Sequence, residues 1–172
     1  PKFDLGGVPD AGGMNCGGGE QFSYLWAANS TQGTISKIDT ATVTEVGRYA
    51  VRPDLQGSPS RTSVSLSGNV AVANRSGGVT KIWANVDNCE ESNGQPGIQT
   101  SSGPNDVLAW GADECVVWSV THPFNGQQTA GPRGTTWTPG DFNEETCQFD
   151  NQKVWVGWLT GPGQAVMGRL DG

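Results

Sequence analysis

The sequence predicts an all-β fold built from a repeated unit of about 40–45 residues. Short apolar runs of about five residues, rich in β-branched and aromatic side chains, are bounded by Gly, Asn, Ser and Pro, which is typical of strands. No long window repeats its apolar positions every ~3.6 residues, so no amphipathic helix is predicted. The runs also recur at a nearly constant interval, which indicates that one structural unit is repeated.

Four apolar runs carry the repeat. The first is LWAAN at 25–29, and the second is VAVAN at 70–74, 45 positions later. A third run, CVVWS at 115–119, follows after another 45 positions, and a fourth, VWVGW at 154–158, follows after 39. The first, second and fourth runs are therefore predicted to be the same strand in successive units. The third run adds a further unit if it belongs to a blade and not to an insertion.

The segments that flank these runs complete the units. The first two runs are each followed by a Gly-containing turn and an alternating segment, so they are predicted to form hairpins over about 25–38 and 70–82. A further strand at 62–66 precedes the second hairpin. The fourth run repeats the scheme with a Gly-Pro-Gly turn and a returning strand at 164–171, after an acidic insertion at 141–152.

Proline-containing marks divide the chain into units. Ser58-Pro59 and Gly103-Pro104 lie 45 positions apart, and Gly131-Pro132 repeats the mark before the fourth run. Residues 1–20 contain seven glycines and no apolar periodicity, so we expect a linker there. The remainder, 21–172, is then one domain with units near 21–57, 58–102, 103–130 and 131–172.

A period of this length, with several strands in each unit, is that of a propeller blade. A small twisted sheet cannot cover its own two faces, and radial stacking buries both. The alternative is a β-sandwich, which does not predict an echo at 45 residues. The segments LWAANSTQGTISKIDTATVTEVGRYAV and PSRTSVSLSGNVAVANRSGGVTKI resemble the propeller repeats of secreted bacterial proteins of the NHL/YVTN and virginiamycin-B-lyase-like kind. The resemblance covers residues 22–86 well and 131–172 loosely.

The resemblance implies a fold of three to four propeller-type blades. Closed propellers have about 4–8 blades, so we expect a ring that is incomplete or is completed by another chain. Propellers of this kind serve as enzymes, ligand binders and scaffolds, so the resemblance does not by itself select a function.

Composition and cysteine usage limit the environment and the partners. The chain has a net charge of −7 and no basic stripe, which disfavours nucleic acid, and no apolar run is long enough to span a membrane. Four cysteines without a CxxC pair, and a single histidine, disfavour zinc. Disulfides are the better interpretation, and of the three possible pairings we favour Cys89–Cys115, which leaves Cys16–Cys147. We therefore expect a secreted, periplasmic or cell-surface protein.

The segment NVDNCEESNGQPGIQTSS at 85–102 is a candidate calcium loop. Glu91, Asn93 and Gln95 occupy positions 1, 3 and 5 of such a loop, and Gly97 offers its carbonyl at position 7. The segment resembles the D-x-[DN]-x-[DN]-G loops inserted in extracellular propellers, but it lacks the acidic residue at position 12. Asp106, Asp113 and Glu114 are the candidates for the missing charge. The alternative is a polar loop, closed by a disulfide, that binds no metal.

Other candidate chemistry is weaker. His122 is the one imidazole, and in a lyase of the resembled family it would act as acid or base. Several tryptophans are candidates for a carbohydrate platform, although tryptophan in a propeller more often packs between blades: Trp83, Trp110, Trp118, Trp137, Trp155 and Trp158. The sequence favours a binding or structural module that recognises a protein or a glycan. The alternatives are a lyase or hydrolase with its active site on one propeller face, and a protein that assembles with further copies of itself.

Overall fold

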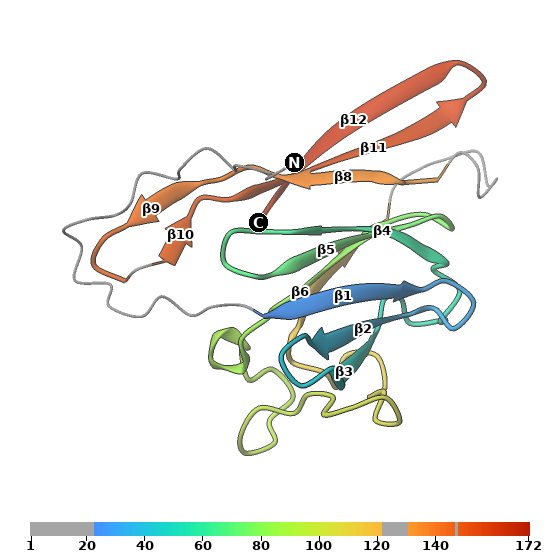
Figure 1. Ribbon diagram of the computed structural model, residues 1–172. Coiled ribbons are helices and arrows are strands. Elements are labelled where there is room, and N and C mark those ends of the chain that lie inside the picture. The colour runs from blue at the N-terminus through green and yellow to red at the C-terminus, as the bar shows by residue number, and fades with distance from the viewer. Residues whose placement is uncertain (1–22, 122–130, 147) are drawn as a thin grey trace, which may run out of the picture.

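The computed structural model describes residues 23–121, 131–146 and 148–172, and this part of the chain is all-β. Its strands form three larger antiparallel sheets that lie one above another, with a small hairpin beside the third (Figure 1). Within the described ranges the one helical element is a short 3₁₀ turn, η1 (Val86–Asn88). The all-β prediction is confirmed.

Sheet 1 is a three-stranded meander near the N-terminus. It contains β1 (Tyr24–Asn29), β2 (Thr34–Asp39) and β3 (Thr44–Ala50) in that order. The turn between β1 and β2 depends on Gly33, which has φ +66°, and a Cβ there would lie 1.9 Å from the carbonyl oxygen of Leu55. Only glycine fits this left-handed position against a neighbouring backbone.

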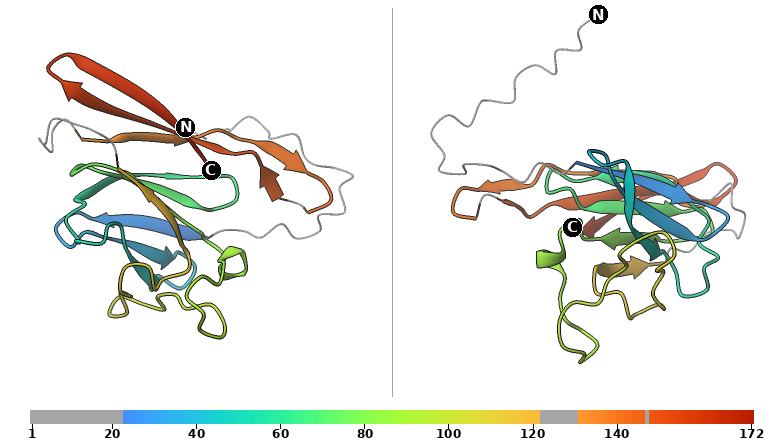
Figure 2. Two further views of the ribbon diagram at one scale, coloured as in Figure 1. Left: turned by 180° about the vertical axis from the view of Figure 1, so that it is seen from behind. Right: turned by 60° about the horizontal axis from the view of Figure 1, so that its bottom comes forward.

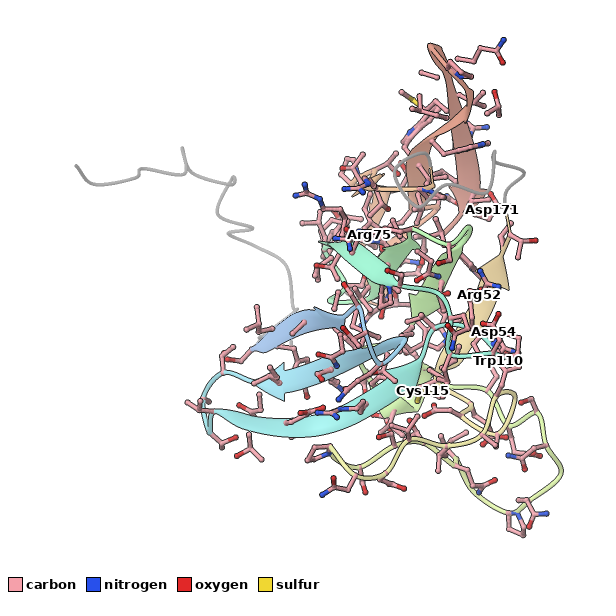
Figure 3. All side chains as sticks on the ribbon, turned by 90° about the vertical axis from the view of Figure 1, so that its right-hand side faces the viewer. Arg52, Asp54, Arg75, Trp110, Cys115 and Asp171 are labelled. Carbon is pink, nitrogen blue, oxygen red and sulfur yellow. A yellow bond between two sulfur atoms is a disulfide. The ribbon has the colours of Figure 1, made fainter. Side chains whose placement is uncertain are left out.

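Sheet 2 is a four-stranded meander in the middle of the stack. It contains β4 (Pro59–Val64), β5 (Val70–Asn74), β6 (Val79–Ile82) and β7 (Val116–Val120). Strand β7 includes most of the apolar run that we expected in a separate unit near 103–130, and it pairs with β6 instead. A long loop over 83–115 therefore connects two adjacent strands, and its base lies at Cys115 (Figure 3).

Sheet 3 contains β8 (Gly134–Trp137), β11 (Lys153–Gly161) and β12 (Gln164–Asp171), with β11 in the centre. The acidic insertion predicted between its strands forms the hairpin β9 (Asp141–Asn143) and β10 (Gln148–Asp150). The β9–β10 hairpin extends from one end of sheet 3, and the β11–β12 hairpin extends from the other (Figures 1 and 2).

The strand register shows the repeat more sharply than the sequence does. Trp26 pairs with Lys37 in sheet 1, Ala71 with Lys81 in sheet 2, and Trp155 with Arg169 in sheet 3. Each pair joins the second residue of an apolar run to a cation on the next strand. The three sheets therefore carry equivalent positions, and a basic side chain recurs at one of them.

A second recurring contact supports this equivalence. The amide of Asn29 donates to Ser36 Oγ at 2.7 Å, and the amide of Asn74 donates to Thr80 Oγ1 at 3.2 Å. Both pairs lie on the face that points away from the following sheet. The repeat is thus a repeat of contacts as well as of apolar runs.

Two hydrophobic clusters hold the stack together. The first joins sheets 1 and 2 and includes Trp26, Ile35, Tyr49, Val70 and Val72. The second joins sheets 2 and 3, where Ala71 and Val79 contact Val154 and Val156, with tryptophans at the margin. Because residues alternate between the faces of a strand, sheet 2 buries Val70 and Val72 on one face and Ala71 on the other. A series of sheets that share their faces is compatible with propeller blades, and no sheet among the described residues closes on itself.

Candidate binding pocket at Lys81

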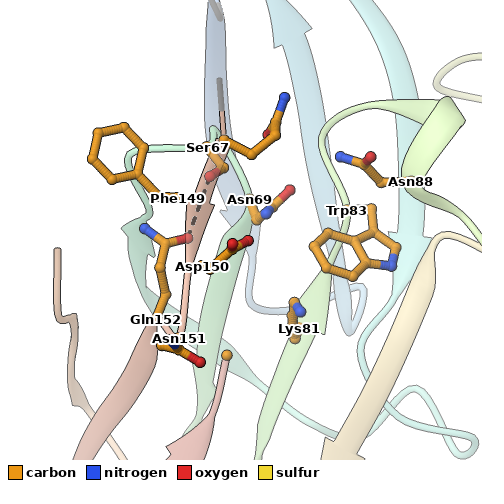
Figure 4. A pocket seen from close by; sticks show the side chains of 11 residues that line it. Ser67, Asn69, Lys81, Trp83, Asn88, Phe149, Asp150, Asn151 and Gln152 are labelled. Carbon is orange, nitrogen blue, oxygen red and sulfur yellow. Dashed lines mark hydrogen bonds between the residues drawn. The ribbon is translucent and has the colours of Figure 1, made fainter. Parts of the chain in front are cut away.

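A polar pocket of about 330 Å³ lies between sheet 2 and the β9–β10 hairpin that adjoins sheet 3 (Figure 4). Its walls come from the β4–β5 turn, the end of β6, the 3₁₀ turn and the segment around β10. The lining residues are Ser67, Asn69, Lys81, Trp83, Asn88, Gln148, Phe149, Asp150, Asn151, Gln152 and Gly172. The pocket thus combines amides, one carboxylate, one ammonium group and two aromatic rings.

Lys81 is the unusual residue of this pocket. Its side chain is 2% exposed, and its ammonium nitrogen lies 3.5 Å from the centroid of the Trp83 ring. Burial lowers the pKa of Lys81 to about 8, and the negative charge of Glu90 opposes that shift. Lys81 Nζ makes no hydrogen bond or ion pair with the residues that the structure describes. A buried cation held only by a ring face remains available to an anion.

The equivalent lysine of sheet 1 shows a different arrangement. Lys37 also lies over aromatic rings, 4.1 Å from the centroid of Tyr24, but its ammonium group donates a hydrogen bond to the carbonyl oxygen of Ala84. By register, the counterpart of Ala84 in sheet 3 is Gly172, which lines the Lys81 pocket. At the junction of sheets 2 and 3 the pocket therefore occupies the place that a lysine–carbonyl hydrogen bond fills at the junction of sheets 1 and 2.

Hydrogen bonds hold several wall residues in place. Asn69 Oδ1 accepts the backbone N–H of Ala84 at 3.0 Å, which fixes the orientation of the Asn69 amide. Gln152 accepts from Ser67 Oγ at 3.4 Å and donates to the carbonyl of Pro139 at 3.3 Å. These contacts orient the polar groups before any ligand arrives, which lowers the entropy that binding must remove.

The hairpin side of the pocket is ordered in the same way. Asp150 Oδ2 accepts from the Asn143 amide at 2.8 Å, and the Asn151 amide donates to Asp141 Oδ2 at 3.0 Å. Phe149 packs on Phe142, with ring centroids 5.1 Å apart. The arrangement can recognise a ligand with hydroxyl groups and an anionic group.

Side chains of the candidate calcium loop form hydrogen bonds with the backbone of the same loop. Glu91 Oε1 accepts the N–H groups of Asn93 at 3.0 Å and Gly94 at 2.6 Å, and Asn93 Oδ1 accepts the N–H of Gln95 at 2.9 Å. The carbonyl of Gly97 accepts from the side chain of Gln99. These contacts occupy oxygens that a cation would need.

Asp106 and Glu114 are used elsewhere in the same loop. Asp106 Oδ2 accepts from both the backbone and the hydroxyl of Ser102. Glu114 accepts the N–H groups of Ser92, Asn93 and Gln99. No group of three or more His, Cys, Asp or Glu side chains among the described residues could hold a metal. Calcium also binds amide and carbonyl oxygens, so calcium binding stays a prediction.

A disulfide joins Cys89 and Cys115, the pair favoured from the sequence, with Cα atoms 4.7 Å apart. It closes the loop that connects β6 to β7. The other expected pair, Cys16–Cys147, and the candidate acid–base residue His122 lie outside the described residues. No helix in the described ranges has the length and apolar character needed to cross a bilayer.

Sequence reasoning missed Lys81. The segment VTKI was interpreted only as a strand, and Trp83 was considered only as one of six possible platform residues. The alternation along β6 places Lys81 on the same face as Val79, so a lysine on the apolar face of a predicted buried strand was the available signal. The hairpin residues of the pocket had no such signal, because their position depends on tertiary packing.

The comparisons with known proteins place no constraint on this pocket. A scan against protein-family models found no match to the chain, and a search of curated proteins found none either.

Proposed function

We propose that the chain is a secreted or cell-envelope binding module, built on propeller-type sheets, that holds an acidic saccharide in the Lys81 pocket. The observation that carries this proposal is a buried ammonium group that lines a polar cavity and forms no ion pair with the described residues. The negative charge of Glu90 acts on this group but does not offset the effect of burial on its pKa. A sugar carboxylate would supply the missing negative charge.

The energetic argument starts from the cost of burying charge. An ammonium group removed from water is destabilising unless it is paired, and the lowered pKa of Lys81 reflects this cost. A carboxylate that enters the pocket would form a charge-assisted hydrogen bond with the ammonium group. Binding would therefore recover free energy that the empty pocket lacks.

The rest of the lining favours a saccharide as the carrier of that charge. Amide side chains both donate and accept hydrogen bonds, as sugar hydroxyls require, and Asn69, Asn88 and Asn151 line the pocket. The rings of Trp83 and Phe149 offer apolar surfaces against which the C–H face of a sugar packs. One carboxylate, Asp150, adds an acceptor for hydroxyl groups and disfavours ligands of high negative charge.

The proposed location rests on the disulfide, because such bonds persist in oxidising compartments. The propeller-type assignment rests on the register equivalence of the three sheets and on the period of the sequence.

The test is calorimetric titration with an oligogalacturonate and, in parallel, with a neutral oligosaccharide of the same length. Lys81→Met keeps the apolar stem and removes the charge, and we expect it to weaken binding of the acidic probe by at least about tenfold. Lys37→Met is the matched control, because the equivalent lysine is bonded to Ala84, and it should leave affinity unchanged. Equal affinity of the wild type and Lys81→Met would overturn the proposal, as would preference for the neutral probe.

The pH dependence gives a second readout of the same contact. Only protonated Lys81 attracts a carboxylate, and its pKa of about 8 in the free protein places the loss of affinity in the alkaline range. Affinity for the acidic probe should fall as pH rises above about 8, while Lys81→Met shows no such decline. An affinity that is flat between neutral pH and pH 10 would contradict the role of Lys81.

A further inference from the structure

The outer face of sheet 3 is an apolar surface with no neighbour among the described residues. Met167 is 70% exposed there and Trp155 is 36% exposed. They line a shallow groove of about 390 Å³ together with Gly134, Thr136 and Gly157. On the opposite face, Val154 and Val156 are buried against sheet 2. Sheet 3 is therefore apolar on both faces and covered on one.

The exposed positions have buried equivalents in the other two sheets. Met167 pairs with Gly157, as Ile35 pairs with Ala28 and Val79 with Ala73. Ile35 and Val79 are fully buried, each against the following sheet. Met167 on the outer face of sheet 3 thus occupies the position at which sheets 1 and 2 pack an apolar side chain against the next sheet.

A second position shows the same relation. Trp155 is equivalent by register to Trp26 and Ala71, both of which are buried. The cation that follows them also recurs, since Arg169 lies 5.9 Å from the centroid of the Trp155 ring. The positions of Met167, Trp155 and Arg169 therefore define a docking face that all three sheets carry. This face is covered by the next sheet in sheets 1 and 2 and is exposed in sheet 3.

The free face of sheet 1 carries the other half of the junction. Leu25 is 55% exposed, whereas its register equivalents Val70 and Val154 are fully buried against the preceding sheet. Ala27 occupies the next position on the same face, where sheets 2 and 3 have Val72 and Val156. Each end of the stack thus presents the residues that the internal junctions bury.

We propose that the outer face of sheet 3 docks the free face of sheet 1 of a second copy of this chain. The new junction would repeat the two internal ones, with Met167 and Trp155 of one copy against Leu25 and Ala27 of the other. Two copies carry 3 + 3 = 6 larger sheets, within the range of about 4–8 that closes a propeller. A dimer with both junctions formed is the expected particle.

Analytical ultracentrifugation of two variants tests this head-to-tail geometry. Met167→Asp places a charge on one half of the junction and Leu25→Asp places it on the other, and both side chains are exposed in the single copy. Each variant alone should be monomeric, because both junctions of the dimer contain one altered face. An equimolar mixture should form a dimer, because the intact sheet 1 of Met167→Asp meets the intact sheet 3 of Leu25→Asp.

Val43→Asp is the control, since Val43 is exposed in the turn between β2 and β3, and it should dimerise as the wild type does. Circular dichroism of each variant confirms that the sheets are retained. A wild-type protein that stays monomeric up to roughly 1 mM would overturn the proposal, since the junction would then have less than about 4 kcal/mol of binding free energy. Self-association of Leu25→Asp with loss only in Met167→Asp would also overturn it, because sheet 3 would then be docking on itself.

Discussion

Lys81→Met should stabilise the fold and at the same time remove the proposed binding function. The lysine is buried and forms no ion pair with the described residues, and the effect of burial outweighs the attraction of Glu90, so its charge destabilises the folded state at neutral pH. Methionine has a similar length and fills the same apolar path along β6. The substitution therefore removes a charge without creating a large cavity.

The magnitude follows from proton linkage. Lys81 has a pKa of about 8 in the fold, against an ordinary value of 10.5. Between these pH values the unfolded chain holds a proton that the folded chain has released, so the free energy of unfolding rises with pH across this window. The full difference corresponds to about 3 kcal/mol. Because the ammonium group borders an open pocket, we expect about 1–3 kcal/mol.

Urea unfolding at pH 7 and pH 10 measures this effect. At pH 7 Lys81→Met should be more stable than the wild type by about 1–3 kcal/mol, and most of that gap should disappear by pH 10. Tyr49, whose pKa is raised by burial, also affects stability at alkaline pH, but it contributes equally to both proteins and cancels in the comparison. A variant less stable than the wild type at pH 7 would refute the reasoning. A gap that does not change between the two pH values would refute it as well.

Three further outcomes follow from the contacts described above. Reduction of the Cys89–Cys115 disulfide, or its replacement by Cys89→Ser with Cys115→Ser, should lower the free energy of unfolding by about 3 kcal/mol, from the 26-residue separation; equal unfolding curves with and without reductant would contradict this. Gly33→Ala should lower the melting temperature far more than Gly163→Ala. Both glycines have a positive φ, which costs an alanine about 1 kcal/mol, but of the two only Gly33 would place a Cβ against the backbone of another segment. Similar losses of melting temperature in the two variants would show that this close approach is not the cause. Hydrogen bonds from the backbone N–H of Ser92, and then from that of Gln99, lower the pKa of Glu114 in the folded state. The stability that this carboxylate contributes is therefore present above its unfolded pKa and is lost as pH falls through its folded pKa. Glu114→Gln should therefore speed hydrogen exchange at Ser92, Asn93 and Gln99 at neutral pH, and unchanged exchange rates would show that the carboxylate does not hold this loop.

Much of the all-β fold follows from local sequence patterns. The runs at 25–29, 70–74 and 154–158 form strands because they are short, apolar and bounded by turn residues. The 45-residue interval correctly identified β1 and β5 as equivalent strands. The strands that follow them, β2 and β6, are equivalent at an interval of 44 residues, because Lys37 and Lys81 occupy the same register position.

Two features depend on contacts that no local pattern encodes. The run at 115–119 has the composition of a first strand, yet most of it forms the last strand of sheet 2, because its place is set by pairing with β6 across a long loop. The pocket at Lys81 requires the hairpin residues around Asp150 to lie beside β6, although the two segments are far apart in the chain. Strand parity could have shown that Lys81 faces inward, but not what it would meet there.

The position of the Cys89–Cys115 bond has a consequence for how sheet 2 assembles. Strand β7 must find β6 across 115 − 82 = 33 intervening residues, so this pairing is the most distant neighbour contact within that sheet. Once the sulfurs are joined, the shortest covalent path between the two strands is about a quarter as long. The entropic free-energy cost of bringing β7 to β6 is then lower by about 1 kcal/mol. Oxidation is therefore expected to act as a folding aid that brings the last strand to its partner, and a chain synthesised under reducing conditions should complete sheet 2 last.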